Sequence, residues 1–152
     1  MNIIFSEETM PSESIINRLI EAAELCVLAE NLDQDRVEIS VSFIGEEEMH
    51  DLNKLFRNVD HVTDVLSFPQ YENMEELPEE GIICLGDVVI CSEQALIQAD
   101  ELGHSPEREI LYLFVHSMFH LMGYDHMDNE EKTDMREKEE TIMTKLGSER
   151  QI

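Results

Sequence analysis

The residues that decide this fold are 110–126, which read ILYLFVHSMFHLMGYDH. Positions 110–122 are apolar almost all round, which predicts a helix buried in the core of the protein. His116 and His120 are four residues apart, so on that helix they share one face and can converge on one ion. The helix is therefore expected to be a core element and to carry chemistry.

A third histidine lies just beyond this helix. Gly123 can end the helix in the left-handed conformation, after which the chain can bring His126 back to the same ion. Three neutral imidazoles with a fourth position left to water are typical of a catalytic zinc site. The structural alternative is that a histidine on a buried helix is a hydrogen-bonded core residue. Each buried imidazole needs a polar partner, however, and a shared metal would supply one to all three.

Composition limits the class of protein. The chain has 152 residues, 42% of them hydrophobic, and we predict a single domain over residues 1–152. No apolar run approaches the ~20 residues that a membrane span needs, and the N-terminus turns acidic at once, unlike a signal peptide. We therefore expect a cytoplasmic protein with no membrane association. Cys26, Cys84 and Cys91 lack a CxxC spacing and are expected to be reduced, buried thiols.

The charge is strongly negative, with 35 acidic residues against 10 basic ones and a net charge of −25. Such a surface repels polyanions over most of its area, which argues against a general nucleic-acid binder, and no DNA partner is expected. Any nucleic-acid substrate would have to be bound at a local basic or metal-centred spot.

Hydrophobic periodicity predicts the remaining elements. We expect strands near residues 2–5, 37–43, 65–69 and 82–91, and helices near 12–27, 46–56, 92–102, 105–122 and 128–146. Because strands and helices mix without regular alternation, the predicted class is α+β with one small sheet. Leu55 and Phe56 are expected to face inward from their helix, as are Leu96 and Leu102 from theirs. The apolar run that predicts an interior strand over 82–91 is interrupted by Gly86-Asp87.

The spacing H-x-x-x-H-x-x-G-x-x-H is that of the metal ligands in metzincin proteases. In those enzymes the residue after the first histidine is a glutamate that acts as general base, whereas here it is Ser117. A serine hydroxyl cannot take a proton from water at neutral pH, so the protease base is missing. A metal-dependent hydrolase of another substrate, protease-like in its ligands, is kept as an alternative.

Three ordered motifs over about residues 37–146 resemble the YbeY family of bacterial ribosomal-RNA maturation endonucleases. The first is the histidine segment, where His116, His120, Leu121, Gly123, Tyr124, Asp125 and His126 match, while Ser117 replaces a usual glycine and Phe119 a usual leucine. The second is Leu52-Asn53 through Arg57, Asp60 and the run 63–69, TDVLSFP. The third is Gly86-Asp-Val-Val-Ile90, which is similar to a G-D-I-x-I strand.

This resemblance implies a small mixed sheet flanked by helices, with the three-histidine metal site at a helix end. It implies a zinc-dependent, single-strand-specific endoribonuclease acting in rRNA processing at the 3′ end of the small-subunit rRNA and in ribosome quality control. The implied partners are ribosomal RNA and the small ribosomal subunit, with ribosomal proteins or an assembly GTPase. A non-enzymatic assembly factor with a structural metal remains the other alternative.

In the expected mechanism, His116, His120 and His126 hold one Zn²⁺ per chain, although three histidines also suit Ni²⁺ or another divalent metal. The ion lowers the pKa of bound water toward ~7. Arg57 grips the non-bridging oxygens of the phosphate and stabilises the charge that develops there. On residue type alone, Arg57 could instead be a surface residue paired with Asp60 or Glu48; the motif around it favours the catalytic role.

Four acids are candidates to orient the imidazoles or to be turn and cap residues: Asp60, Asp64, Asp125 and Asp128. His50, His61 and His104 lie in polar stretches and are expected to be solvated. Since a chain of net charge −25 attracts RNA poorly, we expect a ribosomal protein or assembly factor to deliver the substrate, and binding to free RNA to be weak and strongly salt-sensitive.

Overall fold

The computed structural model describes residues 1–6, 11–124 and 128–147. Its centre is one four-stranded sheet in the order β1-β2-β4-β3. The strands are β1 (Asn2–Phe5), β2 (Val37–Ile44), β3 (Val65–Pro69) and β4 (Ile83–Cys91). β1, β2 and β4 are parallel, whereas β3 runs antiparallel to β4 along the edge, which confirms a mixed sheet.

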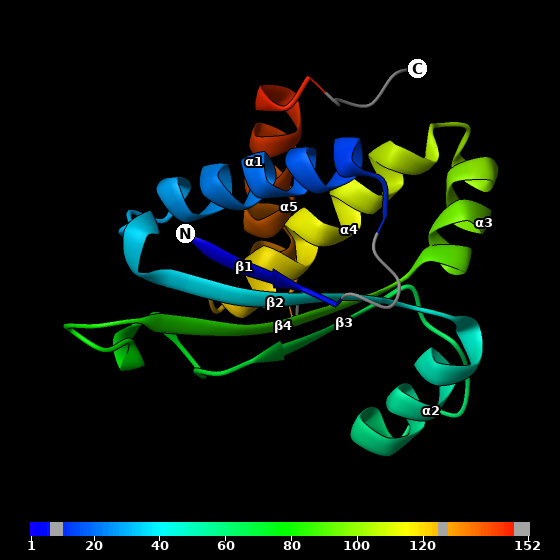
Figure 1. The fold of residues 1–152 in the computed structure, drawn as a ribbon, viewed down its shortest axis with the longest axis horizontal. Coiled ribbons are helices and arrows are strands. Elements are labelled where there is room, and N and C mark those ends of the chain that lie inside the picture. Colours follow the sequence, from blue (N-terminus) through cyan, green and yellow to red (C-terminus); the bar gives the residue numbers. More distant parts are fainter. Residues whose placement is uncertain (7–10, 125–127, 148–152) are drawn as a thin grey trace.

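Helices surround this sheet unequally. They are α1 (Glu13–Ala29), α2 (Glu46–Arg57), α3 (Ser92–Leu102), α4 (Pro106–Leu121) and α5 (Asn129–Lys145), with short 3₁₀ turns η2 (Gln34–Arg36) and η3 (Met74–Glu76). α1 and α4 lie over one face of the sheet, and α5 packs against both of these helices (Figure 1). α2 stands apart at one end of the sheet, on the other side (Figure 1). The predicted α+β class is confirmed.

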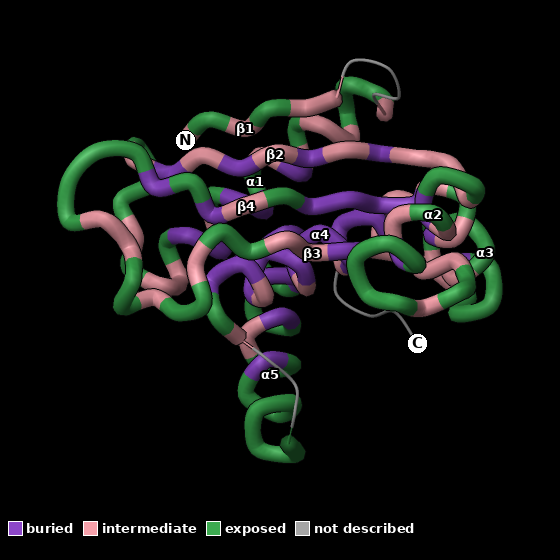
Figure 2. Tube along the Cα trace, turned by 90° about the horizontal axis from the view of Figure 1, so that it is seen from below, coloured by how far each residue is buried: buried purple, intermediate pink, exposed green. Residues whose placement is uncertain are grey.

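The main core lies between the sheet and α1, α4 and α5. In β2, Val37, Ile39, Val41 and Phe43 are buried and alternate with half-buried residues, as the sequence predicted. α4 is the most enclosed helix, since it contacts β3, β4 and the three helices α1, α3 and α5 (Figure 2). A second, smaller core joins Met49 of α2 to Leu66, Val89 and Cys91 on the opposite face of the sheet.

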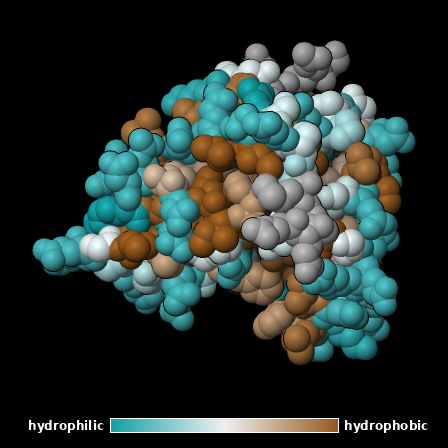
Figure 3. All heavy atoms as spheres, viewed as in Figure 1, coloured by the Kyte–Doolittle hydropathy of each residue, from teal (hydrophilic) through white to brown (hydrophobic). Residues whose placement is uncertain are grey.

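Two helices bury less than their apolar residues suggested. Leu55 is 74% exposed and Phe56 60% exposed, and Leu96 and Leu102 are also exposed, so these four inward predictions were wrong. α3 packs mainly against α4, and α2 lies at one end of the sheet, so each helix leaves part of its apolar surface uncovered (Figure 1). The buried residues of α2 are Met49 and the polar Asn53, whose contacts are described with the site. Exposed apolar side chains also appear on the face drawn in Figure 3, between hydrophilic ones.

β4 forms one strand, as predicted, and it runs through Gly86-Asp87, where the apolar run is interrupted. At this point the strand takes up one extra residue: Glu38 pairs with Cys84 and the next residue of β2 pairs with Gly86, which leaves Leu85 as a bulge. Gly86 has φ +138°, and a Cβ there would lie 2.1 Å from the carbonyl oxygen of Phe68. Only glycine allows β3 and β4 to approach this closely.

No helix in the described part of the chain is both long and apolar enough to cross a membrane. The three cysteines are free, and Cys26 and Cys91 are buried as expected. Cys84 is exposed, so that part of the prediction was wrong. In β4 Cys84 alternates with Ile83 and Leu85, which are buried in the main core, so the exposed position follows the period of the strand.

Candidate active site

Helix α4 is mostly buried, and it carries the two partly buried histidines of the predicted site. The Ser105 side chain accepts a hydrogen bond from the backbone N–H of Arg108, and Pro106 follows at the first helical position, which is the start predicted from the sequence. Nearly every side chain of α4 from Ile110 onward is buried. His116 and His120 are only partly buried, because their shared face looks into a cleft beside β3.

The end of α4 holds one imidazole in place. Gly123, at φ +97°, donates its N–H to the carbonyl of His120, and the N–H of Tyr124 reaches the carbonyl of Phe119. This pair of bonds is a Schellman motif, completed by ring contact between Phe119 and Tyr124 at 5.5 Å. The turn brings the Tyr124 carbonyl to 2.9 Å from Nδ1 of His120.

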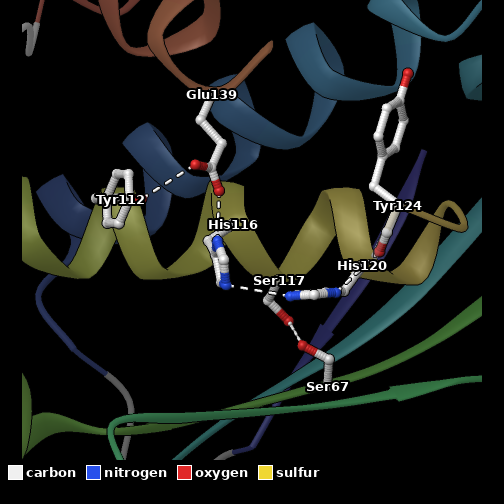
Figure 4. Close-up of polar contacts among 7 residues, drawn as sticks. All are labelled: Ser67, Tyr112, His116, Ser117, His120, Tyr124 and Glu139. Carbon is white, nitrogen blue, oxygen red and sulfur yellow. Dashed lines mark hydrogen bonds and ion pairs between the residues drawn. The ribbon is translucent and has the colours of Figure 1, made fainter. Parts of the chain in front are cut away.

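The other imidazole is held from α5. Nδ1 of His116 donates to the carboxylate of Glu139, which is 3% exposed, and the Tyr112 hydroxyl donates to the same carboxylate at 3.1 Å (Figure 4). Burial, and then the neighbouring Glu139, raise the pKa of Tyr112, so its hydroxyl keeps its proton and remains a donor. Tyr112 also stacks on the ring of His116, with 6.1 Å between centroids.

With both Nδ1 atoms engaged, the Nε2 atoms of His116 and His120 face each other 3.1 Å apart (Figure 4). His126 and Asp125 lie outside the described residues. Within residues 1–6, 11–124 and 128–147, no group of three histidine, cysteine or acidic side chains is arranged to hold a metal. The structure thus brings together two of the three predicted ligands, and the metal site stays a prediction.

The cleft in front of these histidines has a volume of about 570 Å³. Residues from β3, the loop before it, the loop after it, α4 and the end of α2 line it: Arg57, Thr63, Asp64, Val65, Ser67, Pro69, Tyr71, Glu72, Tyr112, Leu113, His116, His120, Gly123 and Tyr124. Arg57 is the one lysine or arginine among these described lining residues. Arg57, the predicted catalytic residue, therefore lines the same cleft as His116 and His120.

Arg57 reaches the cleft because of how α2 ends. Asn58 takes the left-handed conformation at φ 57° and closes the helix with bonds to the carbonyls of Asn53 and Lys54. The buried amide of Asn53 donates to the carbonyl of His61 at 2.8 Å and so ties the following loop to the helix. Sequence reasoning gave Asn53 no role. Its signal was its position four residues after Met49, on the inward face of α2.

The alternative for Arg57 was a surface ion pair with Asp60 or Glu48. Asp60 instead binds His50 at 2.7 Å, and this hydrogen bond, followed by the charge of Lys54, lowers the pKa of Asp60. Arg57 is exposed and makes no ion pair with another residue in the part of the chain that is described. Nothing in the structure thus supports the ion-pair alternative.

The predicted orienting acids make other contacts. Asp64 accepts from the backbone N–H of Val65 at 2.7 Å, and Asp128 caps α5 by accepting from the N–H of Glu131 at 2.8 Å, so each is a turn or cap residue. Glu139 takes the orienting role and was missed. It lies between Met135 and Ile142 on the buried face of α5, and a carboxylate in an apolar stripe was the available signal.

His104 was expected to be solvated and is not. Its Nε2 lies 2.5 Å from the carboxylate of Glu109, which is buried, and Arg108 contacts its other ring nitrogen at 3.2 Å. The acid comes from the first turn of α4, five residues later, and this local fold-back encloses the ring. His61 is exposed, as predicted, whereas His50 is half-buried and hydrogen-bonded to Asp60.

Comparison with known proteins gives a consistent result. The family model described as endoribonuclease YbeY matches residues 2–147. An endoribonuclease YbeY from Caldanaerobacter subterraneus subsp. tengcongensis is 47% identical, covering 99% of this chain and 100% of its own length. One from Clostridioides difficile is 46% identical, covering 92% and 91%. The chain belongs to the endoribonuclease YbeY family.

The fold agrees with that assignment. The solution structure of a Thermotoga maritima protein superposes with a TM-score of 0.60 at 26% identity, covering 97% of this chain and 91% of that one. The resemblance stated from three motifs is therefore confirmed, and so is the prediction of a hydrolytic nuclease as the class of enzyme. A non-enzymatic assembly factor is not supported.

Proposed function

We propose that this protein is a zinc-dependent endoribonuclease that cuts single-stranded RNA in ribosomal RNA processing, at the 3′ end of the small-subunit rRNA. The endoribonuclease names of its relatives support the reaction class. The observation that carries the proposal is the pair of Nε2 atoms 3.1 Å apart, on two rings whose Nδ1 atoms are already held.

The chemistry of these donors fits a metal. A backbone carbonyl only accepts hydrogen bonds, so Nδ1 of His120 keeps its proton and the neutral ring has its lone pair on Nε2. An ionised carboxylate also only accepts, so Nδ1 of His116 donates its proton to Glu139 and the lone pair of this ring is likewise on Nε2. Two Nε2 atoms this close together can bind one cation jointly. Tetrahedral zinc, with Zn–N bonds of about 2.0–2.1 Å, holds two nitrogens roughly 3.3 Å apart, close to the observed separation.

His116, His120 and His126 would then hold one Zn²⁺ per chain, and the same donors would take Ni²⁺ or another divalent ion. Zinc bound there supplies a Lewis acid that makes water nucleophilic at neutral pH. Glu139 and the Tyr124 carbonyl keep both rings in the tautomer that a metal requires. Arg57 stabilises the negative charge that develops on the phosphate in the transition state.

The lining of the cleft supports a single-stranded substrate. Tyr71 and Tyr112 are aromatic residues that line the same cleft as Arg57. Unpaired bases stack on such rings, whereas the bases of a duplex are already stacked on each other. With a net charge of −25 the chain has little long-range attraction for RNA, so the small ribosomal subunit, with ribosomal proteins or an assembly GTPase, would deliver the substrate in the cytoplasm.

The test compares metal content with cleavage of single-stranded rRNA by purified wild type, His116→Ala, His120→Ala and Arg57→Ala. Lys54→Ala is the matched control, because it removes a cation from α2 that does not line the cleft. We expect about one metal per wild-type chain. The histidine variants should lose both metal and cleavage, while Arg57→Ala keeps the metal and loses at least about tenfold in rate.

Two results would contradict this function. In the first, wild type holds metal, but the Arg57 and histidine variants cut as well as it does, which would make the activity a contaminant. In the second, double-stranded RNA of the same sequence is cut as fast as the single strand, which would exclude the proposed substrate class.

A further inference from the structure

Two serine hydroxyls meet where the edge strand contacts the histidine helix. The Oγ atoms of Ser67 on β3 and Ser117 on α4 lie 2.6 Å apart (Figure 4). Ser117 is the residue after His116, and it is fully buried. Ser67 is half-buried and lines the cleft together with Arg57 and both histidines. One hydroxyl of the pair therefore faces the interior and the other faces the cleft.

Burial decides which hydroxyl donates. Each serine has one proton to donate. Among the described residues, Ser67 is the hydrogen-bond partner of the Ser117 hydroxyl. If Ser67 donated to Ser117, the Ser117 proton would be buried without an acceptor, which is costly. The favourable arrangement is that Ser117 donates to Ser67.

Because Ser117 donates to Ser67, the proton of the Ser67 hydroxyl remains available to a ligand in the cleft. Within the part of the chain that the structure describes, Ser67 makes no second hydrogen bond. Its strand also keeps it in place, because Val65, Ser67 and Pro69 line the cleft while Leu66 between them is in the smaller core on the other face. Ser67 is thus a hydrogen-bond donor in the lining of the cleft that Arg57 and the two histidines share.

We propose that Ser67 is a catalytic residue that donates a hydrogen bond to a non-bridging oxygen of the scissile phosphodiester, and that Ser117 is the positioning residue that orients it. The inference rests on the proposed RNA hydrolysis. A donor fixed in advance where charge develops stabilises the transition state more than the ground state.

The test is a double-mutant cycle on single-stranded RNA with wild type, Ser67→Ala, Ser117→Ala and the double variant. We expect Ser67→Ala to lower kcat about tenfold or more with KM changed less than about threefold. Ser117→Ala should lower kcat about threefold. The double variant should match Ser67→Ala, because Ser117 acts only through Ser67. Ser67→Thr, which keeps a hydroxyl on a strand, should restore most of the activity.

Controls separate chemistry from folding. Ser42→Ala removes a serine from β2, outside the cleft, and should leave kcat unchanged. Metal content and Tm are measured for every variant. Wild-type kcat in Ser67→Ala, loss of metal in that variant, or effects that multiply in the double variant would each overturn the inference. If wild type does not cleave RNA, the proposed function fails and this inference fails with it; if wild type cleaves and Ser67→Ala cleaves equally, only the inference fails.

Discussion

Glu139 shows how much a single residue far along the chain can contribute to a site. It lies 23 residues after His116 in sequence and accepts hydrogen bonds from both His116 and Tyr112. Burying a carboxylate is unfavourable unless charge-assisted hydrogen bonds compensate for lost hydration, and here two donors do so. The same contacts fix the tautomer and direction of the His116 ring.

Replacing this carboxylate should weaken metal binding without removing a ligand. We expect Glu139→Gln to lower zinc affinity about tenfold, because the neutral amide polarises the imidazole less than a carboxylate does. Competition with a chromogenic chelator measures the change. Glu137→Gln, an exposed acid on the same helix, is the control. Equal affinity in Glu139→Gln and wild type would show that Glu139 is merely a core residue.

The cysteines give a second prediction at this scale. Burial, and then the charges of Glu30 and Glu139, raise the pKa of Cys26, whereas Cys84 is exposed. A thiol reagent at pH 8 should therefore modify Cys84 quickly and Cys26 only on unfolding, and Cys84→Ser should abolish the fast phase.

The raised pKa of Cys26 also makes stability depend on pH. Below the ordinary thiol pKa near 9 the group is protonated in both states, so its contribution to stability is fully present. Above that pH the unfolded chain loses the proton and the folded chain does not, so stability falls as pH rises. Urea titrations of wild type and Cys26→Ala between pH 8 and pH 10 measure this: the difference in unfolding free energy should shrink with pH, and a constant difference would contradict the assignment.

At the scale of elements, tight backbone geometry positions the site. The bulge at Leu85 and the close approach at Gly86 set where β3 lies against β4, and β3 carries Ser67. The end of α4 and the end of α2 use the same kind of left-handed closure, at Gly123 and Asn58, to aim His120 and Arg57. Helix ends and strand edges thus hold most of the cleft.

Gly86→Ala should therefore destabilise the whole protein. The added Cβ would meet the Phe68 carbonyl oxygen at 2.1 Å, and we expect a loss of about 3 kcal/mol or more in unfolding free energy. Gly81→Ala is the matched control. It has a similarly positive φ of +84° but nothing within 4 Å of a Cβ, so it should cost only about 1 kcal/mol. Urea denaturation distinguishes them, and equal losses would mean that backbone strain rather than the close contact limits Gly86.

At the scale of the whole molecule, the net negative charge repels RNA, whereas the cleft offers it a positive side chain. The net charge of −25 repels RNA, while Arg57 is the one lysine or arginine among the described residues that line the cleft. Few phosphates can then be neutralised at once. Binding should therefore be weak, with a moderate salt dependence rather than the strong one expected from the sequence, because the slope of log affinity against log salt is about −0.7 per phosphate contact for single strands.

We expect a slope of about −1 to −2 for naked single-stranded RNA, from Arg57 and the proposed metal. Arg57→Ala should make it shallower by roughly 0.7. Fluorescence anisotropy across a salt series, with an uncleaved RNA analogue, gives both values. A slope near zero would mean that the cleft does not contact phosphate, and a slope steeper than about −4 would require a basic surface beyond the cleft.

The amino-acid sequence was sufficient to predict the mixed α+β fold, the strands, the five helices and the pairing of His116 with His120 on α4. These features depend on local periodicity and on short motifs, which the chain expresses within one element. It was not sufficient for Leu55, Phe56, Leu96 and Leu102, because the direction in which a helix faces depends on which neighbour covers it. The metal ligand His126 and the roles of zinc and rRNA stay predictions.

Only the tertiary structure decided that Glu139 and the Tyr124 carbonyl hold the imidazoles, while Asp60, Asp64 and Asp128 make other contacts, and that Ser67 meets Ser117. Glu139 and Ser67 act through contacts between residues 23 and 50 positions apart, and these arise when α5 and β3 pack against α4. Periodicity says which side of an element is buried, but not which polar group lies opposite it. That pairing is set by packing, since a buried polar group is tolerated where its partner is in reach.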